Sequence, residues 1–77
     1  MIRKKSITMC SQEFGRFIRN GRERKGLRQQ DVAARLKVSQ PYYSLIEQGQ
    51  REIDLSQAIA ICQILGLDIS DFTVQYM

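Results

Sequence analysis

The sequence predicts a single all-α domain, and three observations support this prediction. The chain has 77 residues, which is enough for one hydrophobic core and not for two. Apolar residues recur at helical spacing along almost its whole length. No segment shows the period-two alternation of a β-strand, apart from the last few residues. We therefore expect a bundle of helices around one core.

The first helix is expected over residues 12–25. Phe14 and Ile18 recur at helical spacing, and Gly26 stands where helices often end in the left-handed conformation. Gly21 lies on the same inward stripe, although a glycine inside a helix costs about 1 kcal/mol relative to alanine. We therefore expect another stretch of backbone to approach Gly21 closely.

Two short helices are expected next, over residues 29–36 and 40–48. The first is amphipathic, with its apolar residues on one side. The second begins after Ser39, a good N-cap residue, and Pro41 falls in its first turn, where a missing N–H costs little. Residues 37–39 are therefore expected to form a tight turn between the two helices.

Two further helices complete the expected bundle. Asp54 and Gln57 have the spacing of an N-terminal capping pair. The amphipathic helix that follows is marked by five apolar residues at helical spacing: Leu55, Ala58, Ile59, Cys62 and Leu65. Asp68 is placed to cap a last short helix that carries Ile69 and Phe72.

Positive charge is concentrated in the first half of the chain. Residues 1–37 hold eleven of the twelve Lys and Arg residues against three acidic residues, a net charge of +8. Residues 38–77 hold one Arg against five acidic residues, a net charge of −4. This distribution favours binding of a polyanion at one end of the molecule, most simply the phosphate backbone of a nucleic acid. A basic surface that is only solvated is the alternative.

Composition excludes most enzyme classes. Without histidine, the chain has no Ser-His or Cys-His nucleophile pair and no histidine-ligated metal. Cys10 and Cys62 are too few for a zinc site and too sparse for a disulfide framework, which fits a reducing compartment. The longest apolar run, residues 58–62, is too short to span a membrane. We expect no enzymatic activity, no cofactor, no metal, no membrane partner and a cytoplasmic location.

Residues 29–48 have the pattern of two helices joined by a short turn. Ala33 provides the small side chain that two steeply crossing helices require at their closest approach. Five other positions are apolar and can wedge between the two helix axes: Val32, Leu36, Val38, Tyr43 and Ile46. Together these positions make a moderately specific pattern, much stronger than any single residue.

Residues 27–72 resemble the helix-turn-helix domain of the phage-repressor type, the XRE or Cro/lambda-repressor-like family. The similarity is ungapped and clearest in the segments LRQQDVA (27–33), VSQ (38–40), IEQGQR (46–51) and ILGL (64–67), and FGRFIR (14–19) extends it. The resemblance implies a five-helix lambda-repressor-like domain. It also implies that the third helix enters the DNA major groove, usually in a two-fold dimer on a palindromic operator.

The sequence departs from the family pattern at four positions. Lys37 stands where the family commonly has glycine, and a non-glycine residue in the left-handed region costs roughly 1–2 kcal/mol. Arg28 replaces a frequent Ser or Thr cap, Gly21 replaces a usual Leu, and Ile53 replaces a common Pro. These departures indicate a less stable monomer.

The chain is expected to divide into three parts. Residues 1–11 form a basic amino-terminal arm, which either follows the duplex or is an untethered tail. Residues 12–72 form the DNA-binding domain, with the helix-turn-helix unit at 29–48. Residues 73–77 form a carboxy-terminal tail, which is a candidate dimer seam or folds back on its own subunit. The basic residues of the arm are Arg3, Lys4 and Lys5.

The outward face of the 40–48 helix supplies the base-reading candidates. Placing residues at 100° intervals with Tyr43 and Ile46 inward leaves an outer set of Gln40, Pro41, Ser44, Leu45 and Gln48, with Tyr42 at the margin. Gln40 is the best candidate because its amide can donate to N7 and accept from N6 of adenine. We expect it to read an A·T pair. The alternative is that Gln40 is only an exposed first-turn residue.

The remaining outer residues are expected to support this contact. Leu45 and Tyr42 can rest against thymine methyl groups, and Ser44 can bond a base or a phosphate. Phosphate contacts are expected at the amino-terminal ends of the two helices and from four side chains: Arg28, Gln29, Gln48 and Arg51.

The resemblance assigns roles to three residues in and next to this unit. Gln29 lies where family members brace the reading glutamine and touch the DNA backbone. Arg22 and Glu47 lie where relatives form an internal ion pair. In this role Arg22 is unavailable to DNA, and Glu47 holds the reading helix.

The leading hypothesis is a sequence-specific DNA-binding transcriptional regulator, most simply a homodimeric repressor that occludes a promoter on a palindromic operator. No ligand-binding domain is predicted, so control is expected from concentration, cleavage or a regulatory protein partner. The alternative is a protein-interaction or antitoxin-like module of the same fold, suggested by the uncharged outward face that carries Pro41 and Leu45.

Overall fold

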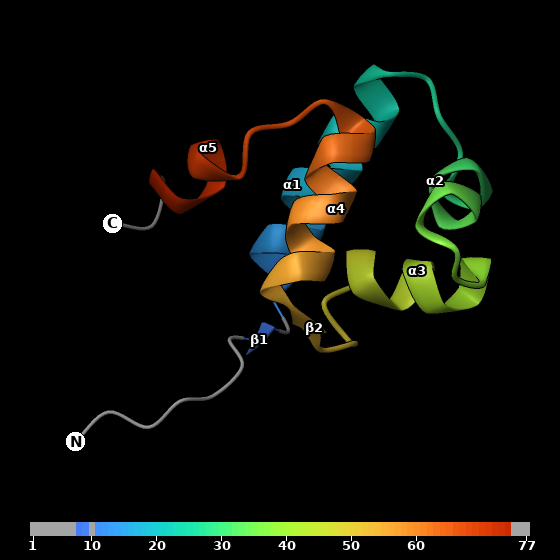
Figure 1. The fold of residues 1–77 in the computed structure, drawn as a ribbon, viewed down its shortest axis with the longest axis horizontal. Helices are drawn as coiled ribbons and strands as arrows, with labels where there is room; N and C mark the ends of the chain where they lie inside the picture. Colours follow the sequence, from blue (N-terminus) through green and yellow to red (C-terminus); the bar gives the residue numbers. More distant parts are fainter. Residues whose placement is uncertain (1–7, 10, 75–77) are drawn as a thin grey trace.

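The computed structural model describes residues 8, 9 and 11–74 and confirms the predicted all-α, five-helix class. Figure 1 shows α1 and α4 packed beside each other, with α2 and α3 on one side of them and α5 on the other. The elements in chain order are β1 (Thr8–Met9), α1 (Gln12–Arg24), α2 (Gln29–Leu36), α3 (Gln40–Glu47), β2 (Ile53–Asp54), α4 (Leu55–Leu65) and α5 (Ile69–Val74).

The helix boundaries follow the capping residues. The Ser11 hydroxyl accepts a hydrogen bond from the Phe14 N–H at the start of α1, and Ser39 accepts from the Tyr42 N–H at the start of α3. At the start of α4, the carboxylate of Asp54 accepts from the third residue of the helix, as predicted. These side chains satisfy backbone donors that would otherwise have no partner. Both α1 and α3 end one residue before the predicted position.

A small β-ribbon is the one element type that the sequence analysis missed. Thr8 pairs with Asp54 and Met9 pairs with Ile53 in an antiparallel register. Two-residue strands are too short to show period-two alternation, so the pattern carried no sign of them. The ribbon ties part of the expected arm to the segment before α4. Arg3, Lys4 and Lys5 lie outside the described residues.

One hydrophobic core joins all four long helices and β2. Phe72 of α5 packs edge-on against Phe14, with ring centroids 5.3 Å apart, and this contact anchors α5 to α1. Cys62 is buried as expected, and burial raises the pKa of its thiol to about 11, so the thiol is unreactive at neutral pH. The core residues are Phe14, Ile18, Val32, Ala33, Tyr43, Ile46, Ile53, Ala58, Ile61, Cys62 and Leu65.

Glycine marks a close approach of backbone, but at Gly15 and not at the expected Gly21. A Cβ at Gly15 would lie 2.7 Å from the carbonyl carbon of Glu47, so α1 touches the end of α3 there. A Cβ at Gly21 would instead meet the side chain of Leu67. The prediction for Gly21 is wrong because a leucine side chain, and not backbone, fills the space beside it.

The turn between α2 and α3 carries the strain expected from its sequence. Lys37 adopts φ 66° and ψ 42°, the left-handed region, where other helices of the chain use glycine. The N–H of Val38 then donates to the carbonyl of Ala33, which closes the turn and directs the chain into α3.

Within the described residues, no helix combines the length and the apolar character needed to cross a bilayer.

Candidate nucleic-acid interface

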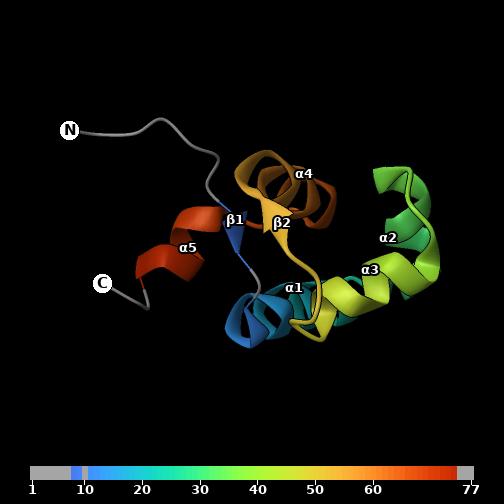
Figure 2. The same ribbon diagram turned by 90° about the horizontal axis from the view of Figure 1, so that it is seen from below.

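Helix α3 lies at the surface of the molecule, along its lower side in Figure 1, and Figure 2 shows it from below. Its inner side chains, Tyr43 and Ile46, are almost fully buried in the core. Its outer side chains match the predicted set: Gln40, Pro41 and Leu45 are exposed, and Ser44 and Tyr42 are half-buried. The outer face of α3 is therefore free to meet a partner.

A buried ion pair holds the inner side of α3 against α1. The Nε and Nη2 atoms of Arg22 donate to the two carboxylate oxygens of Glu47 at 2.7 and 3.1 Å, and Nη1 donates to the Leu27 carbonyl at 2.9 Å. The two side chains are only 11% and 3% exposed. These are the two residues that the family resemblance placed in an internal pair. With Nε and both Nη atoms engaged inside the protein and the side chain only 11% exposed, Arg22 is poorly placed to bind a phosphate.

Hydrogen bonds from the Arg22 guanidinium determine the charge of this pair. Burial alone would raise the pKa of Glu47, but the donors around its carboxylate, Arg22 first, outweigh that penalty and hold the pKa below its usual value. Glu47 is therefore ionised at neutral pH, and its carboxylate can only accept hydrogen bonds.

The carboxylate of Glu47 fixes the orientation of two glutamine amides in sequence. Gln29 Nε2 donates to Glu47 Oε1 at 3.0 Å, because a carboxylate offers only acceptors. The Oε1 atom of Gln29 is thereby left for Gln40, whose Nε2 donates to it at 2.6 Å. The second N–H of Gln40 and its Oε1 make no hydrogen bond within the described part of the chain. Gln40 thus presents one donor and one acceptor side by side, the pair that the N7 and N6 atoms of adenine require.

The central and carboxy-terminal outer residues of α3 have partners of their own. Gln48 Nε2 donates to the Ser44 hydroxyl at 3.0 Å, so these two residues act together. Tyr42 contacts both α4 and the loop after α3. Its hydroxyl accepts a hydrogen bond from Gln57 Nε2 at 3.3 Å, and the Arg51 guanidinium lies 5.0 Å from its ring centroid. Only part of Tyr42 can therefore reach a base.

The predicted phosphate contacts fall at both ends of this surface. Arg28 is highly exposed just before α2, where its backbone N–H donates to the Asp31 carboxylate. Gln29 brings the amino-terminal end of α2 against that of α3 through its bond to Gln40. Arg51 is exposed beside Tyr42, and Gln48 is exposed at the end of α3. The four candidate side chains therefore lie before and in α2, at the end of α3 and in the loop that follows it.

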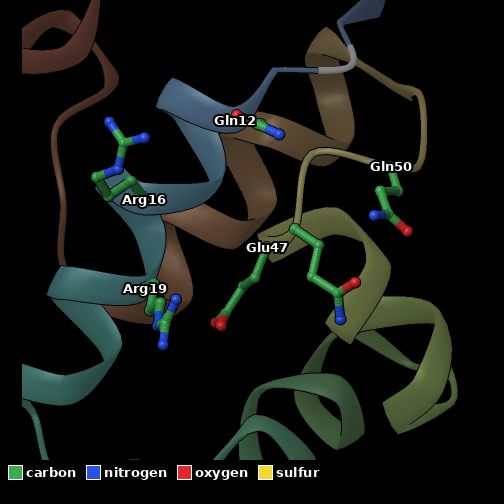
Figure 3. Close-up of a pocket in the computed structure, with 6 residues that line it drawn as sticks. Gln12, Arg16, Arg19, Glu47 and Gln50 are labelled. Atoms are coloured by element: carbon green, nitrogen blue, oxygen red, sulfur yellow. The ribbon is translucent and has the colours of Figure 1, made fainter.

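The structure adds a cleft that sequence reasoning did not identify. It lies between α1 and the end of α3, has a volume of about 240 Å³, and is lined by Gln12, Arg16, Arg19, Glu47, Gln48 and Gln50. Figure 3 shows Arg16 and Arg19 on α1 and Glu47 across from them. The spacing of Arg16 and Arg19, three residues apart on one helix, was the available sign in the sequence.

Comparison with known proteins agrees with the fold and with the resemblance seen in the sequence. The helix-turn-helix domain family matches residues 13–72. Two crystal structures of the clp gene regulator ClgR from Corynebacterium glutamicum are similar, with TM-scores of 0.78 and 0.77. Each is 26% identical over 86% of this chain, which corresponds to 70% and 86% of the two ClgR chains. No curated protein sequence matches the chain.

Helix-turn-helix domains bind DNA by placing one helix in the major groove, which points to a DNA-binding protein and not to an enzyme. The family match spans most of the sequence and covers all or part of every helix described above. The chain belongs to the helix-turn-helix domain family.

Proposed function

We propose that the chain is a sequence-specific transcriptional regulator that inserts α3 into the DNA major groove, with Gln40 reading an A·T pair. The observation that carries this proposal is the hydrogen-bonded series from Glu47 through Gln29 to Gln40. An amide held by a buried ion pair has a defined donor and acceptor side before DNA arrives, so little ordering is needed on binding. The likeness to ClgR, a gene regulator, supports the regulator class.

Several side chains on the outer face of α3 take part in the proposed base reading. A bidentate contact between Gln40 and adenine is worth roughly 1–3 kcal/mol of discrimination. Leu45, 37% exposed, is placed to meet a thymine methyl group, and the outer part of Tyr42 is placed to assist. Pro41 fills the first turn without presenting an N–H. Ser44 and Gln48, bonded to each other, reach a base edge or a phosphate as a unit.

Phosphate contacts fix the position of α3 in the groove. Free backbone N–H groups at the amino-terminal end of α2, with Arg28 and Gln29, face one strand of the duplex. Arg51, held on the Tyr42 ring, supplies a further cation at the loop after α3. Such contacts are insensitive to sequence and make affinity depend on salt.

We further propose that the active form is a homodimer on a palindromic operator, and that it represses by occluding a promoter. A symmetric dimer would place two α3 helices about 34–36 Å apart on one face of B-DNA. The candidate seam, residues 73–77, lies partly within α5, which ends at Val74, and residues 75–77 lie outside the described residues. Deletion of residues 73–77 followed by measurement of the solution mass tests this seam, because an intact dimer would place the interface elsewhere.

Selection of binding sites from random DNA tests the proposed function. The expected result is enrichment of a two-fold symmetric sequence with an A·T pair at one fixed position in each half-site. Binding of the enriched duplex should exceed binding of random DNA by at least about a thousandfold at the same salt concentration. Equal binding of enriched and random duplexes would refute sequence-specific recognition.

A protein-interaction or antitoxin-like module remains the second candidate, because the outer face of α3 is uncharged and exposes Leu45 and Pro41. This candidate predicts a stable stoichiometric protein complex that involves Leu45, and no measurable DNA binding. Leu45→Asp would then abolish the complex. DNA binding that weakens steeply with added salt would exclude it as the main function.

A further inference from the structure

The cleft between α1 and the end of α3 has an electropositive lining. Its one acidic residue, Glu47, has both carboxylate oxygens engaged by Arg22 and Gln29, so its charge is compensated inside the protein. Arg16 makes no ion pair or hydrogen bond within the described residues. Arg19 lies 3.6 Å from Glu23, but both side chains are more than half exposed, so this pair is weak. Two guanidinium groups are therefore available to an anion.

Amide side chains complete the lining with further donors. The side chains of Gln12 and Gln50 have no hydrogen-bond partner within the described part of the chain, and each carries an N–H₂ group. Gln48 also borders the cleft. Among the described lining residues, an anion in the cleft would thus meet two cations and neutral donors, and no uncompensated acidic group.

Two backbone contacts keep the walls of the cleft in place. At Gly15, α1 packs against the carbonyl of Glu47, and a Cβ at Gly49 would lie 2.7 Å from the backbone nitrogen of Gln12. Gly49 has a φ of 73°, which also favours glycine there. The loop after α3 is therefore held against the start of α1, and the opening between them is formed before any ligand binds.

The cleft adjoins the outer face of α3. Gln48 lines the cleft and also donates to Ser44 on the outer face of α3. The cleft thus opens at the carboxy-terminal end of α3, whereas Arg28 and Gln29 lie at the amino-terminal end. The eight residues of α3 span about 12 Å, comparable with the width of the major groove.

We propose that this cleft is a phosphate-binding site for the DNA strand across the major groove from the strand met by Arg28 and Gln29. Arg16 and Arg19 supply its charge, and Gln12 and Gln50 supply neutral donors. This inference rests on the proposed function, because it assumes that α3 enters the groove. It adds four residues to the proposed DNA interface, and it assigns each end of α3 to a different strand of the duplex.

The test compares an Arg16→Gln/Arg19→Gln double variant with Arg24→Gln, which removes an exposed cation from another face of α1. Binding to the selected duplex and to random DNA is measured over a range of salt concentrations. Removal of phosphate contacts should weaken binding to both DNAs by the same factor, about tenfold, and reduce the magnitude of the salt slope by about 1–2. The base preferences should stay those of the parent. Arg24→Gln should change the slope much less.

A second measurement locates the contact. Methylphosphonate substitution neutralises one phosphate of the duplex at a time. The parent should lose affinity at one phosphate on the far strand, and the double variant should be insensitive at that position alone. Equal sensitivity of the parent and the double variant at every position, with an unchanged salt slope, would overturn the proposed site.

The outcomes separate this site from the proposed function. If the parent enriches no sequence, but the double variant has a smaller salt slope than the parent, sequence-specific reading is refuted and the phosphate site is retained. A parent that selects a sequence, with a double variant that matches Arg24→Gln, would refute only the site. A parent that binds no DNA would refute both. The melting temperature of the double variant should stay close to that of the parent, because both arginines are exposed.

Discussion

The two ends of α3 are built in different ways. At the amino-terminal end, Gln40 belongs to a continuous series of hydrogen bonds that begins at a nearly inaccessible ion pair. At the carboxy-terminal end, an open cleft presents arginines without strong partners. The first arrangement fixes which atom of an amide faces outward, and the second offers charge with little orientation. The amino-terminal end is suited to reading the identity of a base, and the carboxy-terminal end is suited to binding the phosphate backbone of DNA of any sequence.

Loss of an arginine from the buried ion pair should destabilise the domain much more than loss of an arginine from the cleft. Arg22→Ala should lower the free energy of unfolding by about 3–5 kcal/mol, because it leaves the Glu47 carboxylate buried without its cation. A domain of this size has little stability to lose, so the variant should be largely unfolded at room temperature. Arg19→Ala, the matched change at the cleft, should cost under about 1 kcal/mol. Denaturant unfolding measures both, and equal small losses would contradict the structural role of the ion pair.

The contact between α1 and the end of α3 can be tested with glycine substitutions. Gly15→Ala should destabilise the domain by roughly 1–3 kcal/mol, because its Cβ would press on the backbone carbonyl of Glu47. Gly21→Ala is the control, since its Cβ meets only the flexible end of the Leu67 side chain, and helix propensity favours alanine by about 1 kcal/mol. Gly21→Ala should therefore cost less. A thermal melt that ranks the two variants in the opposite order would contradict this packing.

Acid should weaken the hydrogen-bonded series that runs from Glu47 through Gln29 to Gln40. The lowered pKa of Glu47 means that the stabilisation from its ionisation is complete above about 4.5, the unfolded-state value, and is lost as the pH falls through the lower folded-state value. Asp31 behaves in the same direction, because its hydrogen bond from the Arg28 N–H lowers its pKa. Unfolding free energy measured from pH 7 to pH 3 should fall in this acidic range. Glu47→Gln should start from a lower stability and show a shallower decline.

The smallest predicted effect lies in the turn that sets the start of α3. Lys37→Gly should stabilise the domain by about 1 kcal/mol, since glycine adopts φ 66° without the steric cost that a side chain incurs. Lys37→Asn, which tolerates this region better than lysine, should give a smaller gain. Chemical denaturation compares the three proteins. A loss of stability in Lys37→Gly would show that the turn is not strained.

Much of this architecture could be predicted from local sequence. The bounds of α2 are those expected, and Ser39 and Asp54 cap the helices that they were assigned to. Capping and helical periodicity involve residues a few positions apart, so the sequence shows them directly. The resemblance to a known family supplied the contacts between distant residues, such as Arg22 with Glu47, which periodicity cannot reveal.

The missed features all depend on packing between segments far apart in the chain. The β-ribbon requires Met9 to meet Ile53, and the cleft requires Gln12 to meet the loop at Gly49. The glycine at the closest backbone approach is Gly15, because α1 crosses the end of α3 six residues, nearly two turns, before the expected position at Gly21. Hydrophobic spacing predicts which face of a helix is buried, but not which neighbour covers each position.

The central claim is that Gln40, oriented by Gln29 and Glu47, makes a paired contact with adenine in the major groove. The most direct measurement replaces that adenine in the selected duplex with 7-deazaadenine, which lacks the N7 acceptor, and compares the parent with Gln40→Ala in a double-mutant cycle. The parent should lose about 1 kcal/mol of binding free energy on this replacement, and Gln40→Ala should lose nothing further. An equal loss in both proteins, or no loss in the parent, would contradict the claim.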